Sequence, residues 1–431
     1  MGEVENSVYR KLVDAAMLAG TILIASGAET YRVEDTTQRI LKTSGFVIAE
    51  SFVLPTGITL TLSNETDCTY SITKRISPGS SNMNRIITVN GISRDFCSGK
   101  ISLDEAFDKL KTIQNEFLYK KMFKVFGTSL AGAGFAMMFG GDVFDGFAAL
   151  ICSFFIGLAL YYFSKIMRKD IFINLFSAAV LCIMASGMAL FANKFIPSIT
   201  LSPQFIIAGS MMTLVPGLTL TNAIRDLLHG DYLSACARMA EAIVTAVSIA
   251  LGAMSGLYFT HLIGMTGNEL AFVLENTRLP LEEILTGIFA SFAAMTGFAI
   301  IYDTPKKFLF ISPIVGVVSW IIYIVATLTG VTSAWASFLA ALSSAFSSFF
   351  LSKIFKAPVT LFLVAGIIPL VPGFYIYRAS YYLITGSGDA GRALVNTFII
   401  AGAIALGIIL MEMFIDLILR LITKTQKIKQ K

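Results

Sequence analysis

One tetrapeptide, Leu-Val-Pro-Gly, occurs twice in this chain. Its proline and glycine are residue types that can form a small-molecule binding site inside a membrane. The copies run from Leu214 to Gly217 and from Leu370 to Gly373, each within a long apolar stretch. Proline lacks an amide hydrogen and glycine permits a turn, so each copy predicts an interrupted helix. Irregular backbone at membrane depth is tolerated only where it is buried in protein or lines a cavity. Paired interruptions in matching halves therefore indicate a transporter's substrate site, with a tolerated kink as the alternative.

Polar residues follow each tetrapeptide and complete the candidate site. We expect substrate to be bound by residues of both copies, namely Pro216, Gly217, Thr219, Thr221, Asn222, Pro372, Gly373, Tyr375 and Arg378. A half-helix that starts near the bilayer centre offers unpaired amides and the positive end of a dipole, which favours a substrate bearing a carboxylate. Arg378 aligns with Asn222 and could hold that carboxylate through its bidentate fork. An interfacial arginine whose head reaches water is the alternative.

Proton coupling requires a carboxylate that can change charge while access alternates. Glu241 lies early in an apolar segment, and intramembrane acids are functional candidates by default. A structural role near the membrane surface is the alternative for this residue. Structural ion pairing is also expected of Glu412 and Asp416 on the last apolar segment. Arg225 and Asp226 are expected to form a pair in a cytoplasmic loop.

The composition is that of an integral membrane protein. The 431 residues are 55% hydrophobic and 14% charged, with a mean hydropathy of +0.74. Residues 1–121 have the mixed composition of a soluble segment, whereas the remainder contains apolar runs long enough to cross about 30 Å of hydrocarbon. Ten such runs are expected, at residues 122–140, 143–163, 171–191, 203–224, 239–263, 284–302, 308–328, 332–351, 358–383 and 393–419.

The distribution of charge orients these runs. Lysine and arginine gather before the first run and after the second, fourth, sixth, eighth and tenth, which predicts that both termini are cytoplasmic. Because each half holds five spans, the two halves run in opposite directions. The sequence thus predicts an α-helical polytopic membrane protein, with ten transmembrane helices in two inverted five-helix repeats and a small α/β cytoplasmic N-terminal domain. The domains are expected at residues 1–121, 122–263 and 284–431, the last ending in a basic tail.

Local signals predict the elements of the N-terminal segment. Helices are expected at Val8–Ala25, Glu29–Thr43 and Leu103–Phe117. Runs of β-branched and aromatic residues predict strands at Phe46–Leu62, Thr69–Ile76 and Arg85–Val89. Ser102 is expected to cap the last helix, and the spacing of Ser26 and Glu29 is that of a capping box.

Several kinds of chemistry are disfavoured. The five cysteines are far apart and the only histidines are His229 and His261, so we expect neither a disulfide framework nor a zinc site. No other metal or cofactor is expected. The first residues are polar and acidic rather than basic and then apolar, so no cleaved export signal is expected.

Two stretches carry a family resemblance. They are Ser-Gly-Ala-Glu-Thr-Tyr-Arg-Val-Glu-Asp at 26–35 and Leu-Val-Pro-Gly-Leu-Thr-Leu-Thr-Asn-Ala-Ile-Arg-Asp at 214–226, supported by Gly230-Asp231 and the second tetrapeptide. With them the chain resembles the threonine/serine exporter family over nearly its whole length. The resemblance implies a cytoplasmic N-terminal domain, ten spans in the cell membrane and proton-driven efflux of small hydroxy amino acids. The family also has split members, one pair of which is associated with succinate export, so a dicarboxylate is the alternative substrate.

The expected partners follow from this resemblance: threonine or serine, protons and the lipid bilayer, with a homo-oligomer left open and no nucleic acid. The family-marking motif of the N-terminal segment comprises Glu29, Arg32, Glu34, Asp35 and Arg39. Its acids and arginines could serve an enzyme, but no histidine, nucleophile motif or phosphate loop accompanies them, so a gating or sensing role is favoured. A channel is the other alternative, although broken helices in inverted halves fit a carrier better.

Overall fold

The computed structural model describes residues 3–64, 69–77, 79, 81–114, 116, 118–166, 170–196, 198–263, 281–373, 375, 378–379, 382 and 389–429. The chain divides into two compact units. Unit one contains Met1–Tyr119, Asp226–Arg238 and Tyr302–Lys306. Unit two contains Lys120–Arg225, Met239–Ile301 and Lys307–Lys431.

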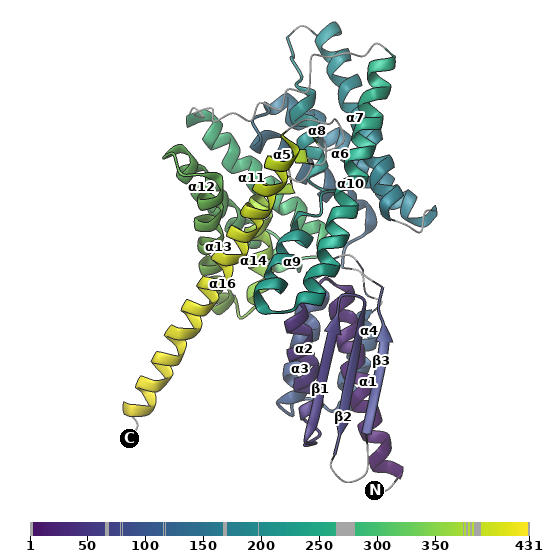
Figure 1. The fold of residues 1–431 in the computed structure, drawn as a ribbon, viewed down its shortest axis with the longest axis vertical. Coiled ribbons are helices and arrows are strands. Elements are labelled where there is room, and N and C mark those ends of the chain that lie inside the picture. The colour runs from purple at the N-terminus through teal and green to yellow at the C-terminus, as the bar shows by residue number, and fades with distance from the viewer. Residues whose placement is uncertain are drawn as a thin grey trace. The chain divides into compact units, whose positions relative to one another are not determined.

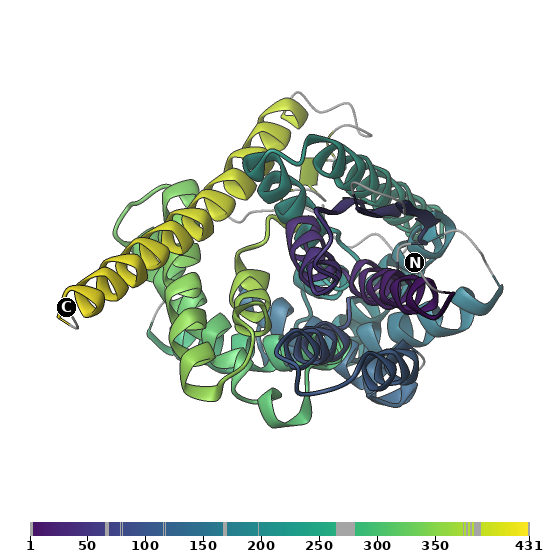
Figure 2. The same ribbon diagram turned by 90° about the horizontal axis from the view of Figure 1, so that it is seen from below.

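The described residues of the first segment of unit one form four helices and a sheet. In chain order these are α1 (Glu3–Ala25), α2 (Thr30–Lys42), β1 (Ile48–Leu54), β2 (Gly57–Ser63), β3 (Thr69–Arg75), α3 (Met83–Cys97) and α4 (Leu103–Gln114). The three strands form one antiparallel sheet in the order β1-β2-β3, drawn in purple in Figure 1. The view from below in Figure 2 shows α1 and α2 side by side.

One face of the sheet forms the core of unit one. Ile58, Leu60 and Leu62 alternate along β2 and are fully buried, because successive side chains of a strand point to opposite faces. Gly20 brings α1 close to this face, since a methyl group at Gly20 would lie 2.6 Å from the Cδ1 atom of Ile58. The other face carries paired hydroxyls, such as Thr59 and Thr73 at 3.0 Å.

Two predicted strands were wrong. Residues 85–89, expected as a strand, lie in α3, whose first turn is capped by Asn82: its side chain accepts a hydrogen bond from the Arg85 amide at 2.9 Å. Ile86 and Val89 are buried at helical spacing, so β-branched composition misled the prediction. The expected single strand at 46–62 is a hairpin that turns at Pro55, which cannot donate to a sheet.

The capping prediction was right for α4 and wrong for α2. The Ser102 hydroxyl accepts a hydrogen bond from the Glu105 amide at 3.2 Å. Ser26, in contrast, belongs to the end of α1, where its amide donates to Ile22 and the chain leaves through Gly27 at a φ of +78°. Glu29 itself is the N-cap of α2 and makes no side-chain capping bond.

Unit two is helical. Its helices are α5 (Lys121–Met138), α6 (Val143–Ile166), α7 (Asp170–Phe195), α8 (Pro203–Met211), α9 (Gly217–His229), α10 (Tyr232–Leu262), α11 (Leu281–Ile301), α12 (Ser312–Leu328), α13 (Ser333–Phe355), α14 (Val359–Ile367) and α16 (Ala390–Lys429), with 3₁₀ turns η1 (Lys306–Phe308) and η2 (Ile368–Leu370). The last residues of α9 and the first of α10 belong to unit one.

Seven helices among the described residues are long and apolar enough to cross a membrane. They cover Val143–Phe163, Ile171–Phe195, Tyr232–Leu262, Ile284–Ile301, Lys306–Leu328, Ser333–Phe355 and Ala390–Ile418. The protein is therefore a multi-pass membrane protein. The other three expected runs contain shorter or less apolar helices: α5, the pair α8 and α9, and α14.

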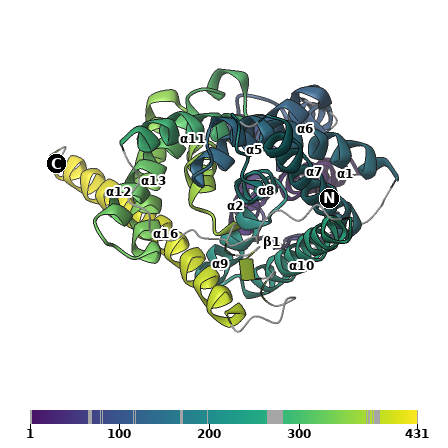
Figure 3. The same cartoon turned by 90° about the horizontal axis from the view of Figure 1, so that it is seen from above.

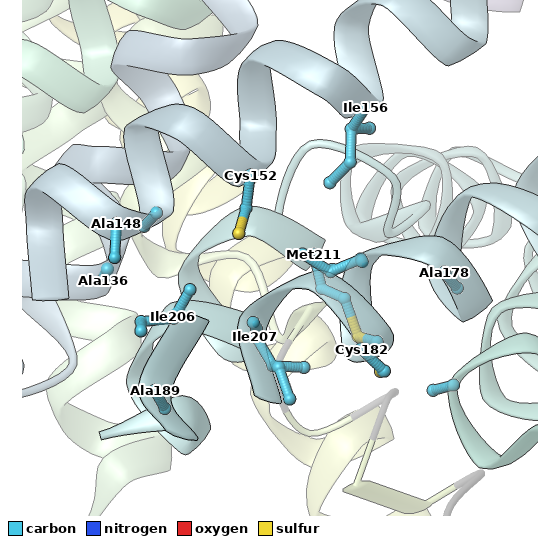
Figure 4. Packing of buried hydrophobic residues seen from close by; sticks show 14 of the residues in the cluster. Ala136, Ala148, Cys152, Ile156, Ala178, Cys182, Ala189, Ile206, Ile207 and Met211 are labelled. Carbon is cyan, nitrogen blue, oxygen red and sulfur yellow. The ribbon is translucent and has the colours of Figure 1, made fainter. Parts of the chain in front are cut away.

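Small residues allow the helices of unit two to approach closely. Gly127 and Gly134 of α5 face α11, where methyl groups in their place would lie 2.8 Å from Ile300 Cγ2 and 2.4 Å from the Ala290 carbonyl oxygen. A second contact zone joins α5, α6, α7 and α8, which neighbour one another in Figure 3. Figure 4 shows its alanine, isoleucine and sulfur-containing side chains, including the buried Cys152 and Met211.

Candidate functional site

Both tetrapeptides interrupt a helix, as the sequence predicted. In the first copy α8 ends at Met211 and α9 begins at Gly217. In the second copy α14 ends at Ile367, η2 follows, and Gly373 is the first helical residue after Pro372. The missing amide of proline and the flexibility of glycine account for both breaks.

The two breaks are in contact, although 156 positions separate Gly217 from Gly373. A methyl group added at Gly217 would lie 1.8 Å from Val371 Cγ1 and 3.6 Å from the Gly373 Cα. A methyl group at Gly373 would in turn lie 3.1 Å from Val215 Cγ1. The glycines are therefore required for the close approach as well as for the turns.

The first turn of α9 has the electrostatic character of an anion site. No acceptor within the described residues is seen for the amides of Gly217, Leu218 and Thr219, whereas the Pro216 carbonyl accepts from the Leu220 amide at 3.0 Å. Unpaired amides and the positive end of the helix dipole both favour a negative charge at this point.

The polar residues of the first copy differ in what they can offer a ligand. The Thr221 hydroxyl is buried and donates to the Gly217 carbonyl at 3.1 Å, so it is used by the helix itself. Thr219 and Asn222 are half-buried, share a helix face by their spacing, and make no side-chain hydrogen bond to a described residue. These two side chains are thus available to a ligand.

The polar residues of the second copy contact other side chains of unit two. Tyr375 packs against a buried cluster from α13, α14 and α16. Arg378 is half-buried, donates from Nε to the Tyr382 hydroxyl at 2.8 Å, and has its guanidinium carbon 5.2 Å from the centre of that ring. Cation–π contact leaves the terminal nitrogens of Arg378 able to donate, and no carboxylate of the described chain pairs with them.

An ion pair that the sequence did not predict joins α9 to α16 in unit two. Arg225 of α9 is buried, and its Nη2 atom lies 2.5 Å from the Glu412 Oε1 of α16. Removing an arginine from water is costly unless a carboxylate pairs with it. The expected pair of Arg225 with Asp226 is therefore wrong: Asp226 instead pairs with Arg238 at 2.9 Å within unit one.

The other predicted acids lie elsewhere. Glu241 is exposed on α10. Asp416 is exposed one turn beyond Glu412 and makes no ion pair with a described residue. Within the part of the chain that is described, no three His, Cys, Asp or Glu side chains come close enough to hold a metal ion.

The family-marking motif in α2 is held by short-range pairs. Arg32 pairs with Glu29 at 3.1 Å, and Arg39 pairs with Asp35, one helical turn away, at 2.8 Å on the surface. Glu34 reaches β1, where its Oε1 atom accepts from the Val53 amide at 3.1 Å. Partial burial raises the pKa of Glu34, against the opposing effect of that hydrogen bond.

Unit one also includes two segments from later in the chain, Asp226–Arg238 and Tyr302–Lys306. The ring of Tyr31 stacks on His229 with centroids 5.1 Å apart, and Arg238 donates to the Ala28 carbonyl at 3.1 Å. Asn82 donates to the Asp303 carboxylate at 2.9 Å. No local sequence signal links these two residues, because they lie 221 positions apart.

Two interrupted apolar helices that meet inside a multi-pass membrane protein are typical of membrane transport proteins. Residues 14–260 match the family described as "Putative threonine/serine exporter", and residues 287–414 match the one described as "Threonine/Serine exporter, ThrE". The chain belongs to the threonine/serine exporter family.

Similar proteins extend over most of the chain. A "Probable threonine/serine exporter" of Mycobacterium tuberculosis is 21% identical over 95% of this chain and 78% of its own length. The "Threonine/serine exporter" of Corynebacterium glutamicum is 21% identical over 94% and 83%. A "Probable succinate transporter subunit" of Klebsiella aerogenes is 24% identical over 61% of this chain and 99% of its own length. No solved structure matches the chain.

Proposed function

We propose that this protein is a secondary active exporter of threonine and serine, coupled to protons, whose substrate binds where the two tetrapeptide breaks meet. The contact between Gly217 and Val371 is the observation that carries the proposal, because it brings both irregular backbones to one place. The names of the relatives from Mycobacterium tuberculosis and Corynebacterium glutamicum support the choice of substrate. Export, rather than an enzymatic reaction, is the proposed activity.

The chemistry of the site fits a hydroxy amino acid. The substrate carboxylate would accept hydrogen bonds from the amides at the start of α9, where the helix dipole is positive. Thr219 and Asn222 would contact the substrate hydroxyl and ammonium from the same helix face. Pro372, Gly373 and Tyr375 would line the opposite side, and Arg378 would supply a second contact to the carboxylate if it swings from Tyr382.

An inverted repeat of five helices is the architecture we propose around this site. The contacts among α5, α6, α7 and α8 have counterparts among α11, α12, α13 and α14, since the same five pairs of positions pack in each set. Equivalent elements also meet across the halves: α5 packs on α11, and the first break packs on the second. Elements that lie next to a pseudo-two-fold axis contact their own counterparts, so these contacts support two related halves.

We further propose ten membrane-crossing segments with both termini and the N-terminal α/β domain in the cytoplasm. In this arrangement α8 with α9, and α14 with the helical residues after Gly373, each cross as a broken pair. Loops rich in lysine and arginine support the orientation. Each half then has an odd number of crossings, so the two breaks enter from opposite sides.

Two acids are candidates for coupling to protons. Glu241, which is exposed on α10, is the first candidate. Glu412 is the second candidate, because its carboxylate compensates the buried charge of Arg225. A proton on Glu412 would remove that compensation and favour a state in which Arg225 moves toward water.

Efflux from proteoliposomes tests the proposed function. Vesicles are loaded in parallel with labelled threonine, serine or succinate, with and without an imposed proton gradient. Gradient-dependent efflux of threonine or serine is the expected result. An efflux rate that does not change with the proton gradient and does not saturate with substrate concentration would identify a channel. That result would contradict the proposal.

Succinate is the alternative substrate, supported by the name of the Klebsiella aerogenes relative. A dicarboxylate carries a second negative charge and would need a second cation, for which Arg378 is the available residue near the breaks. Efflux of succinate alone in the same assay would assign the chain to this alternative.

A further inference from the structure

A pocket of about 670 Å³ lies in unit one between α2 and α3, away from the tetrapeptide breaks in the sequence. Its volume is within the range of about 300–1,000 Å³ that small-molecule sites occupy. On one side, α2 contributes residues that share a helix face through spacings of three and four: Tyr31, Arg32, Asp35 and Arg39. The pocket is thus built on regular helix rather than on a loop.

The opposite side comes from α3. Asn90, Arg94 and Cys97 line the pocket at spacings of four and three, so they also share a face. A hydrogen bond from the Thr36 hydroxyl to the Asn90 Oδ1 atom, at 3.3 Å, ties the two helices together. Cys97 is exposed and its thiol lies 3.5 Å from the Arg39 carbonyl oxygen.

The charges of the pocket do not balance. Arg32 is matched by Glu29 and Arg39 by Asp35. Arg94 is exposed and forms no ion pair with any carboxylate of the described residues. The guanidinium of Arg94 is therefore available to bind an anion. The guanidinium of Arg39 lines the same pocket.

We propose that the α2–α3 pocket binds a small carboxylate-bearing metabolite, with its carboxylate on Arg94. The planar guanidinium matches an oxyanion through two parallel hydrogen bonds. Asp35 in the lining disfavours a ligand of high negative charge such as phosphate, and it provides an acceptor for the ammonium of an amino acid.

This pocket is a second binding site, and the proposal for it does not rest on the proposed transport site. Its Tyr31 side chain stacks on His229, the last residue of α9, and α9 begins at the first break. A ligand in the pocket thus contacts the same tyrosine that holds the end of the tetrapeptide helix.

Protection of Cys97 from a maleimide reagent tests this proposal in the full-length protein. Cys68 and Cys236 are first replaced by serine, because Cys152 and Cys182 are buried and Cys97 then reports on the pocket. Threonine, serine, succinate and inorganic phosphate are added separately. We expect a carboxylate to slow labelling about tenfold at a concentration about ten times its Kd, by simple occupancy.

Three variants make the result decisive. Arg94→Gln should abolish protection, whereas Arg10→Gln, which changes an exposed arginine of α1, should leave it intact. Gly217→Val, which obstructs the tetrapeptide contact, should also leave protection intact and so separate this site from transport. Protection by phosphate alone, protection that survives Arg94→Gln in folded protein, or no protection by any carboxylate would overturn the proposal.

Discussion

Gly217 and Val371 approach each other so closely that any side chain at position 217 would collide with the valine. The added methyl carbon would lie 1.8 Å from Val371 Cγ1, well inside van der Waals contact. The two residues belong to different copies of the tetrapeptide. Their contact is what joins two broken helices into one candidate site.

The first prediction concerns this contact. Gly217→Ala should reduce threonine efflux strongly and destabilise the protein by about 1–3 kcal/mol, because the site is overpacked. Val371→Ala removes the colliding atoms, so the double variant should recover much of both losses. Efflux and thermal unfolding are measured together. Gly187→Ala is the control, since a methyl group there meets no atom within 4 Å.

The second prediction concerns the ion pair between Arg225 and Glu412. Glu412→Gln should cost about 1–3 kcal/mol, because the buried guanidinium loses its charged partner. The double variant Arg225→Met, Glu412→Leu should recover stability, since an apolar pair needs no compensation. Thermal unfolding provides the measurement, and Asp416→Asn on the exposed side of α16 is the control. Equal losses for Asp416→Asn and Glu412→Gln would argue against a structural pair.

The same variants test the coupling role of Glu412. If it carries the proton, Glu412→Gln protein that still folds should exchange threonine between the two sides but lose its response to a proton gradient. Glu241→Gln is compared in the same assay. Loss of the gradient response in Glu241→Gln alone would assign coupling to Glu241.

The third prediction concerns Glu34 and pH. Burial raises its pKa in the folded state, so the folded protein favours the protonated carboxyl more than the unfolded chain does. The contribution of Glu34 to the free energy of unfolding therefore falls as pH rises from the ordinary glutamate pKa of 4.5 toward the raised pKa. Glu34→Gln should be the more stable protein above that window and lose its advantage below pH 4.5. Thermal unfolding against pH measures the difference, with Glu50→Gln at an exposed site as control.

The fourth prediction concerns the substrate's carboxylate. Arg378→Ala should raise the KM for threonine by about tenfold to a hundredfold, the loss expected of one charged hydrogen bond of about 1.5–3 kcal/mol. Arg420→Ala, at an exposed position of α16, should leave KM unchanged. An unchanged KM in Arg378→Ala would indicate that this arginine serves only its contact with Tyr382.

Local chemistry explains which features could be predicted from the sequence. The helix breaks at Pro216 and Pro372 follow from the residues themselves, and so does the pair of Asp35 with Arg39 on one helical turn. The strand expected at 85–89 failed because its composition is ambiguous and the cap at Asn82 decides the outcome.

Contacts between distant residues could not be predicted. Arg225 and Glu412 are 187 positions apart, and neither residue carries a local signal for the other. Arg225 was instead paired with its neighbour Asp226, which the structure contradicts. The pocket of α2 and α3 was missed for a related reason, since no helix was expected at residues 90–98, which supply half of its lining.

The most direct test of the account is threonine efflux by the double variant Pro216→Ala, Pro372→Ala in proteoliposomes with an imposed proton gradient. Alanine restores the missing amides and permits continuous helices, so the irregular backbone at both copies would be lost. If the meeting point of the breaks is the transport site, the variant inserts and remains folded but efflux falls to the level of empty vesicles. Efflux equal to that of the unchanged protein would contradict the account.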